Sequence, residues 1–317
     1  MASQMYRHLL PFAAMAVAAM ATHPFAENEL PESARVDYQS YLADPRRNTQ
    51  DSNQRTLAAS DIFMGKPYAF DSLGDSSLDL FDPRPLYNTD AFDCMTFVST
   101  VLAMVESYSL ESLLTGLVRI RYGPNLPAYF NRHHFISTQW NPSNTKLGFL
   151  EDVTTTILSA EDTSLALVNE DVIDMPNWLQ HQKRQFEKQK MFSPEQQAVW
   201  QQTYQHASLE TARISYIPLD AFFDVNDQIR SYILDQIPAA SVIEFVTPHW
   251  DLTASIGTHL DIMHLGLVVK REGRLYFRHA KIRGSVVELP LEDYLRFLRL
   301  HVPRAQGVHI EKILLTT

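Results

Sequence analysis

Three short apolar runs towards the C-terminal end place the strongest constraint on the fold of this chain. They cover residues 241–247, 262–269 and 275–280, and they are rich in the β-branched and aromatic residues that strands prefer. The residues between the last two runs, Arg-Glu-Gly at 271–273, predict a hairpin turn, and residues 286–289 predict a further strand. Because short turns join antiparallel neighbours, we expect an antiparallel sheet here.

The chain before these runs has helical spacing. Apolar residues recur about one turn apart at 28–47, 50–64, 94–105 and 110–119, which predicts helices with one buried face. Residues 68–91 are rich in Asp, Ser, Gly and Pro and predict a loop. Helices followed by an antiparallel sheet indicate the α+β class, in which helices pack on a face of the sheet.

The N-terminus predicts export. Residues 9–21 form an uncharged apolar run that ends in Ala-Met-Ala, which is typical of a cleaved secretory signal peptide. A run of this length is shorter than the roughly 20 residues that span a bilayer. We therefore interpret residues 1–21 as a signal peptide and expect an exported, periplasmic protein with no membrane span after cleavage.

Residues 22–317 are expected to form a single domain. Within it, residues 144–240 carry a polar, helix-rich pattern with few strand signals. This segment is interpreted as a helical insertion that covers one side of the core.

Composition narrows the classes of partner. The net charge is -10, and no long basic run occurs, which argues against nucleic acid or an anionic membrane surface as the main partner. The chain has one cysteine, Cys94, which cannot form an internal disulfide. An unpaired thiol in an exported protein is either a buried apolar residue or a reactive group.

Cys94 falls in the first turn of the helix predicted at 94–105. Asp93 is the expected N-cap, because its carboxylate can accept hydrogen bonds from the free amides of that turn. The amides and dipole of a helix N-terminus stabilise negative charge, so this position favours a thiolate.

Two histidines are candidates for the base. Along residues 262–269, alternation places His264 and Gly266 on one face and a continuous apolar set on the other. A hairpin turning about Arg271 and Glu272 would set His264 directly across from His279. Directly opposed residues have Cβ atoms about 4.5 to 5.5 Å apart, close enough for one imidazole to orient the other.

The segment Phe-Asp-Cys-Met-Thr-Phe-Val at 92–98 resembles the nucleophile motif of the NlpC-type cell-wall cysteine peptidases. The resemblance is to the N-acetylmuramoyl-L-alanine amidase-like branch. Other segments occur in the order and approximate spacing of that branch: Gly65–Tyr68, Arg119–Tyr122, Arg132–His134, His264–Gly266 and His279–Ala280. One departure is Met95-Thr96, where the superfamily often has Ser-Gly.

This resemblance implies a papain-like α+β fold, with the nucleophile helix packed on an antiparallel sheet. It implies Cys94 as nucleophile, His264 as general base and His279 as the polar residue that orients it. Tyr68 resembles the family tyrosine beside the thiol, which would donate to the substrate carbonyl or the developing oxyanion. The implied activity is cleavage of an amide or peptide bond in the peptidoglycan stem, with peptidoglycan fragments as partner and no cofactor.

The stretch 119–140 is dense in cationic and aromatic residues. It either lines a substrate cleft, where Arg binds carboxylates and aromatic rings pack on sugar or peptide, or forms an ordinary packed segment. The candidate substrate-binding residues are Asp93, Arg121, Tyr122, Arg132 and His133.

Alternatives remain open. A metal amidase would draw on His133, His134, His249 and His259, but no HExxH or other tight ligand spacing occurs, so no metal site is predicted. A catalytically silent wall-binding or scaffold protein would keep the fold without the chemistry. An acyltransferase would use the same three residues. The sequence does not specify the bond that is cut or the oligomeric state.

Overall fold

The computed structural model describes residues 30–70, 87–125, 127, 129–188 and 194–315. The expected signal peptide lies outside these residues. Within them, eight strands join into one sheet in which all neighbouring pairs are antiparallel. The strands are β1 (Leu150–Asp152), β2 (Leu167–Asp174), β3 (Leu209–Pro218), β4 (Ser241–Asp251), β5 (His259–Arg271), β6 (Arg274–Ala280), β7 (Val286–Pro290) and β8 (Gly307–Ile313).

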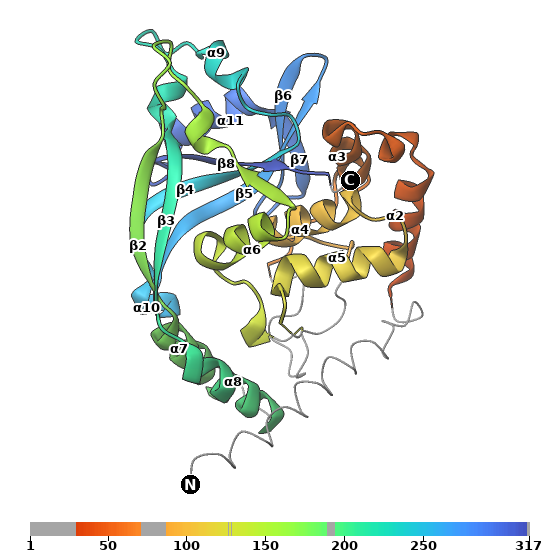
Figure 1. Ribbon diagram of the computed structural model, residues 1–317, viewed down its shortest axis with the longest axis vertical. Helices are drawn as coiled ribbons and strands as arrows, with labels where there is room; N and C mark the ends of the chain where they lie inside the picture. The colour runs from red at the N-terminus through yellow and green to blue at the C-terminus, as the bar shows by residue number, and fades with distance from the viewer. Residues whose placement is uncertain (1–29, 71–86, 126, 128, 189–193, 316–317) are drawn as a thin grey trace.

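The strand order is β2-β3-β8-β4-β5-β6-β7, and β1 pairs with β8 beside this path. In Figure 1, β4 and β5 run through the middle of the molecule, whereas β2 and β3 form its outer side. The expected α+β class with an antiparallel sheet is therefore confirmed.

Helices α2 to α5 gather at one side of the sheet, and α7 and α8 extend from the far end of β2 and β3 (Figure 1). No helix among the described residues is both long and apolar enough to cross a membrane. The helices are α2 (Glu32–Ala43), α3 (Ser52–Asp61), α4 (Cys94–Val105), α5 (Leu110–Tyr122), α6 (Asn141–Lys146), α7 (Met175–Lys188), α8 (Pro194–His206), α9 (Ser231–Leu234), α10 (Thr253–Ile256) and α11 (Leu291–His301). Shorter helical turns are η2 (Pro45–Asn48), η3 (Tyr129–Asn131), η4 (Ile136–Trp140), η5 (Thr154–Thr156) and η6 (Leu219–Phe222).

The helical insertion expected at 144–240 is only partly helical. It includes α7 and α8, but it also supplies β1, β2 and β3 to the sheet. In β2 most side chains are exposed or partly exposed, so few apolar residues mark it as a strand. The expectation of few strands was wrong. Because β2 lies at the edge of the sheet and is largely exposed, it forms a strand with few apolar residues.

The hairpin between β5 and β6 turns one residue later than expected. Arg271 pairs with Arg274, and the ladder ends where Leu267 pairs with Arg278. Glu272 and Gly273 both have positive φ, 50° and 83°, as a two-residue type I′ turn requires. The predicted direct opposition of His264 and His279 is therefore wrong by two residues. Because side chains alternate with a period of two, both histidines still face the same side.

Apolar cores cover both faces of the central strands. On one face, Leu265 and Leu267 of β5 pack with the buried side of α4. On the other, Val268 and Phe277 pack with the leucines of α11. Strands buried on both faces carry nearly continuous apolar sequence, and this pattern explains why the sequence of this region predicts strands.

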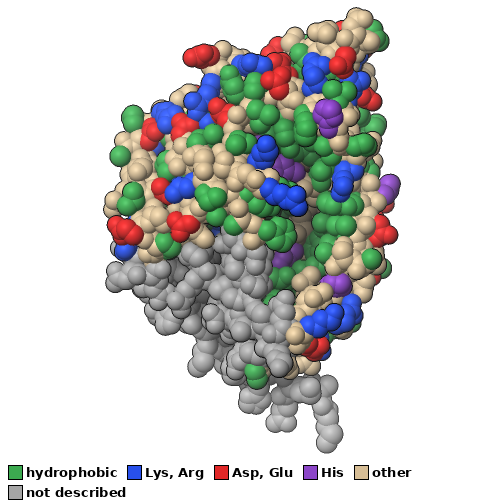
Figure 2. Space-filling model, turned by 180° about the vertical axis from the view of Figure 1, so that it is seen from behind, with side chains coloured by type: hydrophobic (Ala, Val, Ile, Leu, Met, Phe, Trp, Pro, Cys, Tyr) green, Lys and Arg blue, Asp and Glu red, His purple; other side chains and the backbone are tan. Residues whose placement is uncertain are grey.

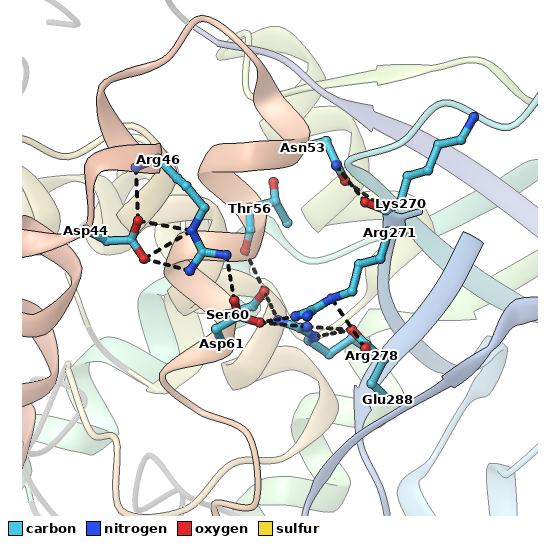
Figure 3. A network of polar contacts seen from close by, with 10 residues as sticks. All are labelled: Asp44, Arg46, Asn53, Thr56, Ser60, Asp61, Lys270, Arg271, Arg278 and Glu288. Carbon is cyan, nitrogen blue, oxygen red and sulfur yellow. Dashed lines mark hydrogen bonds and ion pairs between the residues drawn. The ribbon is translucent and has the colours of Figure 1, made fainter. Parts of the chain in front are cut away.

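A buried arginine links the N-terminal helices to the sheet (Figure 3). Arg278 of β6 has no exposed surface. Its guanidinium donates to the Ser60 hydroxyl at 2.6 Å and to the Glu288 carboxylate at 3.0 Å, and it lies 2.9 Å from a carboxylate oxygen of Asp61. A buried charge requires such partners, so these contacts fix α3 against β6 and β7.

Two further contacts extend this link (Figure 3). Arg46 bridges Asp61 at 2.7 Å and Asp44 at 2.6 Å, which ties the η2 turn to α3. The Asn53 side chain exchanges two hydrogen bonds with the backbone of Lys270, at 2.8 and 2.9 Å. The first helices are thus bonded to β5 near its hairpin end.

The substitution Arg278→Met is expected to lower the free energy of unfolding by about 3 kcal/mol, because it breaks a buried ion pair and removes the bonds of Arg278 to Ser60, Asp61 and Glu288. The matched control is Arg274→Met on the same strand, where the ion pair with Glu292 is exposed and its loss should cost far less. Urea denaturation of the two variants measures both values. Equal losses in the free energy of unfolding would show that the buried Arg278 contacts contribute no more to stability than the exposed Arg274 pair.

A second buried polar group lies between β4 and β8. Glu244 pairs directly with His309, and both are buried together with Glu311. Burial raises the pKa of Glu244 to about 8. Burial alone would lower the pKa of His309, but Glu311 and Glu244 raise it to about 9. Asn141 donates to Glu244 at 2.9 Å and holds it in place.

Stability is therefore expected to fall at alkaline pH. Both groups have folded-state pKa values above their ordinary values of 4.5 and 6.5, so their contribution is complete at low pH and is lost as pH rises through about 8 and 9. The melting temperature should drop between pH 6 and 9.5. Glu244→Gln keeps the bond from Asn141 without the titration and should flatten this decline; an unchanged slope in the variant would contradict the assignment.

Candidate functional site

Cys94 is the first residue of α4, and Asp93 caps this helix. The Asp93 carboxylate accepts a hydrogen bond from the Thr96 amide at 2.7 Å, and the Thr96 hydroxyl accepts one from the Asp93 amide at 2.9 Å. This reciprocal pair is a capping box. The predicted helix start and N-cap are therefore confirmed.

The Cys94 sulfur lies where α4 meets the sheet. It is within hydrogen-bonding reach of the backbone amides of Leu265 and Met95, and part of the residue remains exposed. Leu265 lies just beyond the last β5–β6 pair, which is formed by Leu267. The sulfur is thus held against the peptide that follows His264, at the point where the β5–β6 ladder has ended.

The two predicted histidines meet. His264 Nε2 and His279 Nδ1 are 2.7 Å apart, and both residues are buried. The ring of Phe277 stacks on His279 with centroids 4.6 Å apart. Gly266 of β5 leaves room for the Phe277 ring, because a Cβ at this position would come within 2.6 Å of that ring. The diagonal placement on neighbouring strands therefore brings the imidazoles into contact although they are not directly opposed.

Burial favours the neutral form of all three groups. It lowers the pKa of His264 to about 4. It also lowers the pKa of His279 to about 3, with His264 and Lys281 adding to the effect. Burial, followed by the charge of Asp93, raises the pKa of the Cys94 thiol to about 12, although the nearby amides act in the opposite direction. In this conformation desolvation outweighs the amides of the helix N-terminus, which by themselves would favour a thiolate.

No hydrogen bond joins the Cys94 sulfur to either imidazole among the described residues. The sulfur nevertheless affects the face that carries them. Tyr294 of α11 packs on His279 at 5.1 Å, and its pKa is raised by burial and then by the charge of Cys94. The thiol is therefore linked to the imidazole pair through Tyr294, which contacts His279, and through Leu265, which follows His264.

Tyr68 also lies at this site. It forms a parallel bridge with Phe92, two residues before the cysteine. Burial, followed by Cys94 and Asp93, raises its pKa to about 12, so the phenol keeps its proton and remains a hydrogen-bond donor.

Two of the candidate substrate-binding residues are internal. Tyr122 has no exposed surface, and Arg121 is only 4% exposed. Arg121 donates to the Thr100 hydroxyl at 3.1 Å, and its charge acts on the Asp93 carboxyl, so it supports α4 from α5. Both residues lie inside the fold because the last turn of α5 faces α4, and their contact with substrate stays a prediction.

The remaining candidates lie in the segment after α5. His133 approaches the carbonyl of Ile120 at 3.3 Å, and burial lowers its pKa. The Arg132 guanidinium lies 5.7 Å from the centre of the Tyr129 ring. Tyr129 belongs to an aromatic cluster that packs against α7 and includes Trp178 of that helix.

The histidines considered for a metal have separate partners. The His134 ring contacts the Tyr129 carbonyl at 2.6 Å, His249 lies 3.5 Å from Asp171, and His259 lies 3.8 Å from Asp251. In the described segments, no three His, Cys, Asp or Glu side chains are grouped so that they could hold a metal ion.

The face opposite to that of Figure 1 is hollowed (Figure 2). Hydrophobic side chains line most of the hollow, histidines lie on its floor, and Lys and Arg stand at its rim. A concave apolar surface with a few polar groups is typical of a ligand-binding site.

Sequence reasoning did not find Tyr294. Its helix shows an ordinary amphipathic pattern, in which a tyrosine beside leucines predicts only core packing. Contact with His279 arises from the docking of α11 on the sheet, for which the sequence carries no separate signal.

Comparison with known proteins identifies relatives. Protein LPG0564 from Legionella pneumophila, a member of family DUF1460, is 31% identical, with a TM-score of 0.76 over 95% of this chain and 96% of that one. An N-acetylmuramoyl-L-alanine amidase from Bacteroides uniformis is 22% identical, with a TM-score of 0.57 over 83% of this chain and 98% of that one. The latter similarity concerns the fold. The sequence matches no curated protein.

The AmiA-like family, described as N-acetylmuramoyl-L-alanine amidase-like, matches residues 58–299. This range contains Tyr68, Cys94, both histidines of the buried pair and Tyr294. The chain therefore belongs to the AmiA-like, N-acetylmuramoyl-L-alanine amidase-like family.

Proposed function

We propose that this protein is an exported cysteine hydrolase of the NlpC type, with a papain-like arrangement, that cleaves an amide or peptide bond in the peptidoglycan stem. Membership of an amidase-like family supports an amide substrate from the cell wall. Two observations support the cysteine mechanism: His264 and His279 form a buried pair, and Cys94 begins a capped helix with its sulfur near the amide of Leu265, the residue after His264. Cys94 is the only cysteine of the chain.

The hydrogen bond within the pair specifies the roles of its nitrogens. His264 uses Nε2 towards His279, so Nδ1 of His264 is the nitrogen free to accept a proton. For Nδ1 to be an acceptor, the neutral ring carries its hydrogen on Nε2 and donates it to Nδ1 of His279. His279 thus orients the base and stabilises the imidazolium that forms.

In the proposed reaction, the Cys94 sulfur attacks the substrate carbonyl while its proton passes to His264 Nδ1. The Cys94 backbone amide and the Tyr68 hydroxyl donate to the oxyanion. The C–N bond then breaks as His264 returns the proton to the leaving nitrogen, which leaves a thioester. Water attacks the thioester with its proton passing to His264, the acid is released, and the thiol takes back the proton.

The pKa values favour a concerted first step. Moving the proton from a thiol of pKa about 12 to an imidazole of pKa about 4 would cost on the order of 10 kcal/mol as a separate event. Transfer during attack avoids forming a buried ion pair without substrate. The resting site is therefore neutral and resembles a serine hydrolase more than a thiolate enzyme.

Export is part of the proposal and follows from the signal-peptide pattern at residues 1–21. A mature protein that acts on peptidoglycan must reach the periplasm, which agrees with that pattern.

Cys94→Ala is expected to lower kcat/KM on purified muropeptides by roughly a thousand-fold or more, because no other group can form the acyl intermediate. Ser99→Ala, a small change at a buried position of the same helix, is the matched control and should retain activity. Mass spectrometry of the products also identifies the bond that is cut, and an added amine acceptor separates hydrolysis from acyl transfer. Undiminished cleavage by Cys94→Ala would contradict the mechanism.

The thiol should react slowly with iodoacetamide at pH 7, and its rate should rise only well above pH 9, because burial and Asp93 raise its pKa. Asp93→Asn keeps a capping side chain but removes the charge, so it should label several-fold faster at pH 8. Since Cys94 is the only cysteine, alkylation measured by intact mass reports on it alone. Fast labelling of the unmodified protein with a midpoint near pH 6 would instead indicate a resting thiolate.

A further inference from the structure

Tyr294 of α11 lies beside His279, one of the two residues of the imidazole pair. Its ring packs on His279 at 5.1 Å and stacks on Phe277 at 4.6 Å, and it also contacts Phe245 at 5.2 Å. Three rings therefore fix the position of this tyrosine.

The hydroxyl of Tyr294 has no hydrogen-bond partner among the described residues, and the residue remains partly exposed. Burial and the charge of Cys94 raise its pKa, so the group keeps its proton. A tyrosine fixed by its ring, with an unused donor at its tip, is suited to bind a polar group of a ligand.

The other residues of α11 lie on distinct sides of the helix: leucines face the core, and arginines form ion pairs on another side. Leu291, Leu295 and Leu298 anchor the helix in the core. The basic residues turn to the η6 side, where Arg296 pairs with Asp227 at 2.8 Å and Arg299 with Asp220 at 2.6 Å.

The apolar side continues from the site towards solvent. Phe297, one turn after Tyr294, stacks on it at 6.1 Å and is 49% exposed. Tyr294 and Phe297 therefore form an uncharged aromatic surface, called the α11 wall below, that extends from His279 towards solvent.

In the proposed reaction, the α11 wall lies on the side of the leaving-group half of the substrate. His264 must return its proton to the leaving nitrogen, so the leaving group has to lie on the side of the imidazoles. Tyr294 lies on that side, in contact with His279. The acyl half, in contrast, lies towards the Cys94 amide and Tyr68.

We propose that α11 forms the leaving-group subsite, with the Tyr294 hydroxyl donating a hydrogen bond to a peptide carbonyl of the amine product and the Phe297 ring extending the wall. This inference rests on the proposed function, because it takes the amine half to be a peptide. Tyr294 is then a substrate-contacting residue outside the thiol and imidazole pair.

The test uses binding as well as turnover. In a Cys94→Ala background, Tyr294→Phe should weaken binding of a free stem tripeptide about 3- to 10-fold in calorimetry, as expected for one lost hydrogen bond. The ring is retained, so folding should be unchanged. Tyr276→Phe, on β6, is the matched control and should bind normally.

Turnover then locates the contact. With the Cys94 enzyme, Tyr294→Phe should lower kcat/KM by a similar factor on an amide with a peptide leaving group, and leave it nearly unchanged on an ester with the same acyl group and a small alcohol leaving group. Equal losses on both substrates, or tripeptide binding that the variant does not change, would overturn the proposal. If the enzyme cleaved neither substrate, the proposed function would fail, and the calorimetry would still decide the peptide contact.

Discussion

The architecture depends on the buried guanidinium of Arg278. A nucleophile on an N-terminal helix can act with bases on C-terminal strands only if the two parts of the chain dock at one register. Arg278 precedes His279 on β6 and reaches Asp61 and Ser60 at the end of α3. Because a buried charge tolerates few alternative geometries, it defines how the helices meet the strand that carries the orienting histidine.

The same desolvation that demands partners for Arg278 sets the electrostatics of the site. His264, His279 and Cys94 are all pushed towards their neutral forms, since none of them has a counter-ion that offsets burial. The helix N-terminus does not lower the pKa of this thiol below its ordinary value, because burial and then the charge of Asp93 raise it. The site can therefore rest uncharged, and in the proposed mechanism charge develops only where the oxyanion donors and the imidazole pair receive it.

Local patterns were enough to predict part of the site. The start of α4, the Asp93 cap and the shared face of the two histidines follow from spacing over a few residues, and all are present. The register of the hairpin was missed because it depends on whether Glu272 adopts a left-handed conformation. The internal position of Arg121 was missed because a basic residue in a dense aromatic stretch gives no sign of which side α5 buries.

The sequence by itself determined the α+β class, the helix that presents Cys94 and the strand pair that carries the histidines, because these follow from short-range periodicity and capping. Only the tertiary structure decided that β2 and β3 extend the sheet, that Tyr294 packs on His279 and that the thiol is held in its neutral form. These outcomes depend on which surfaces lose contact with water, and this is a property of the packed chain and not of any local segment.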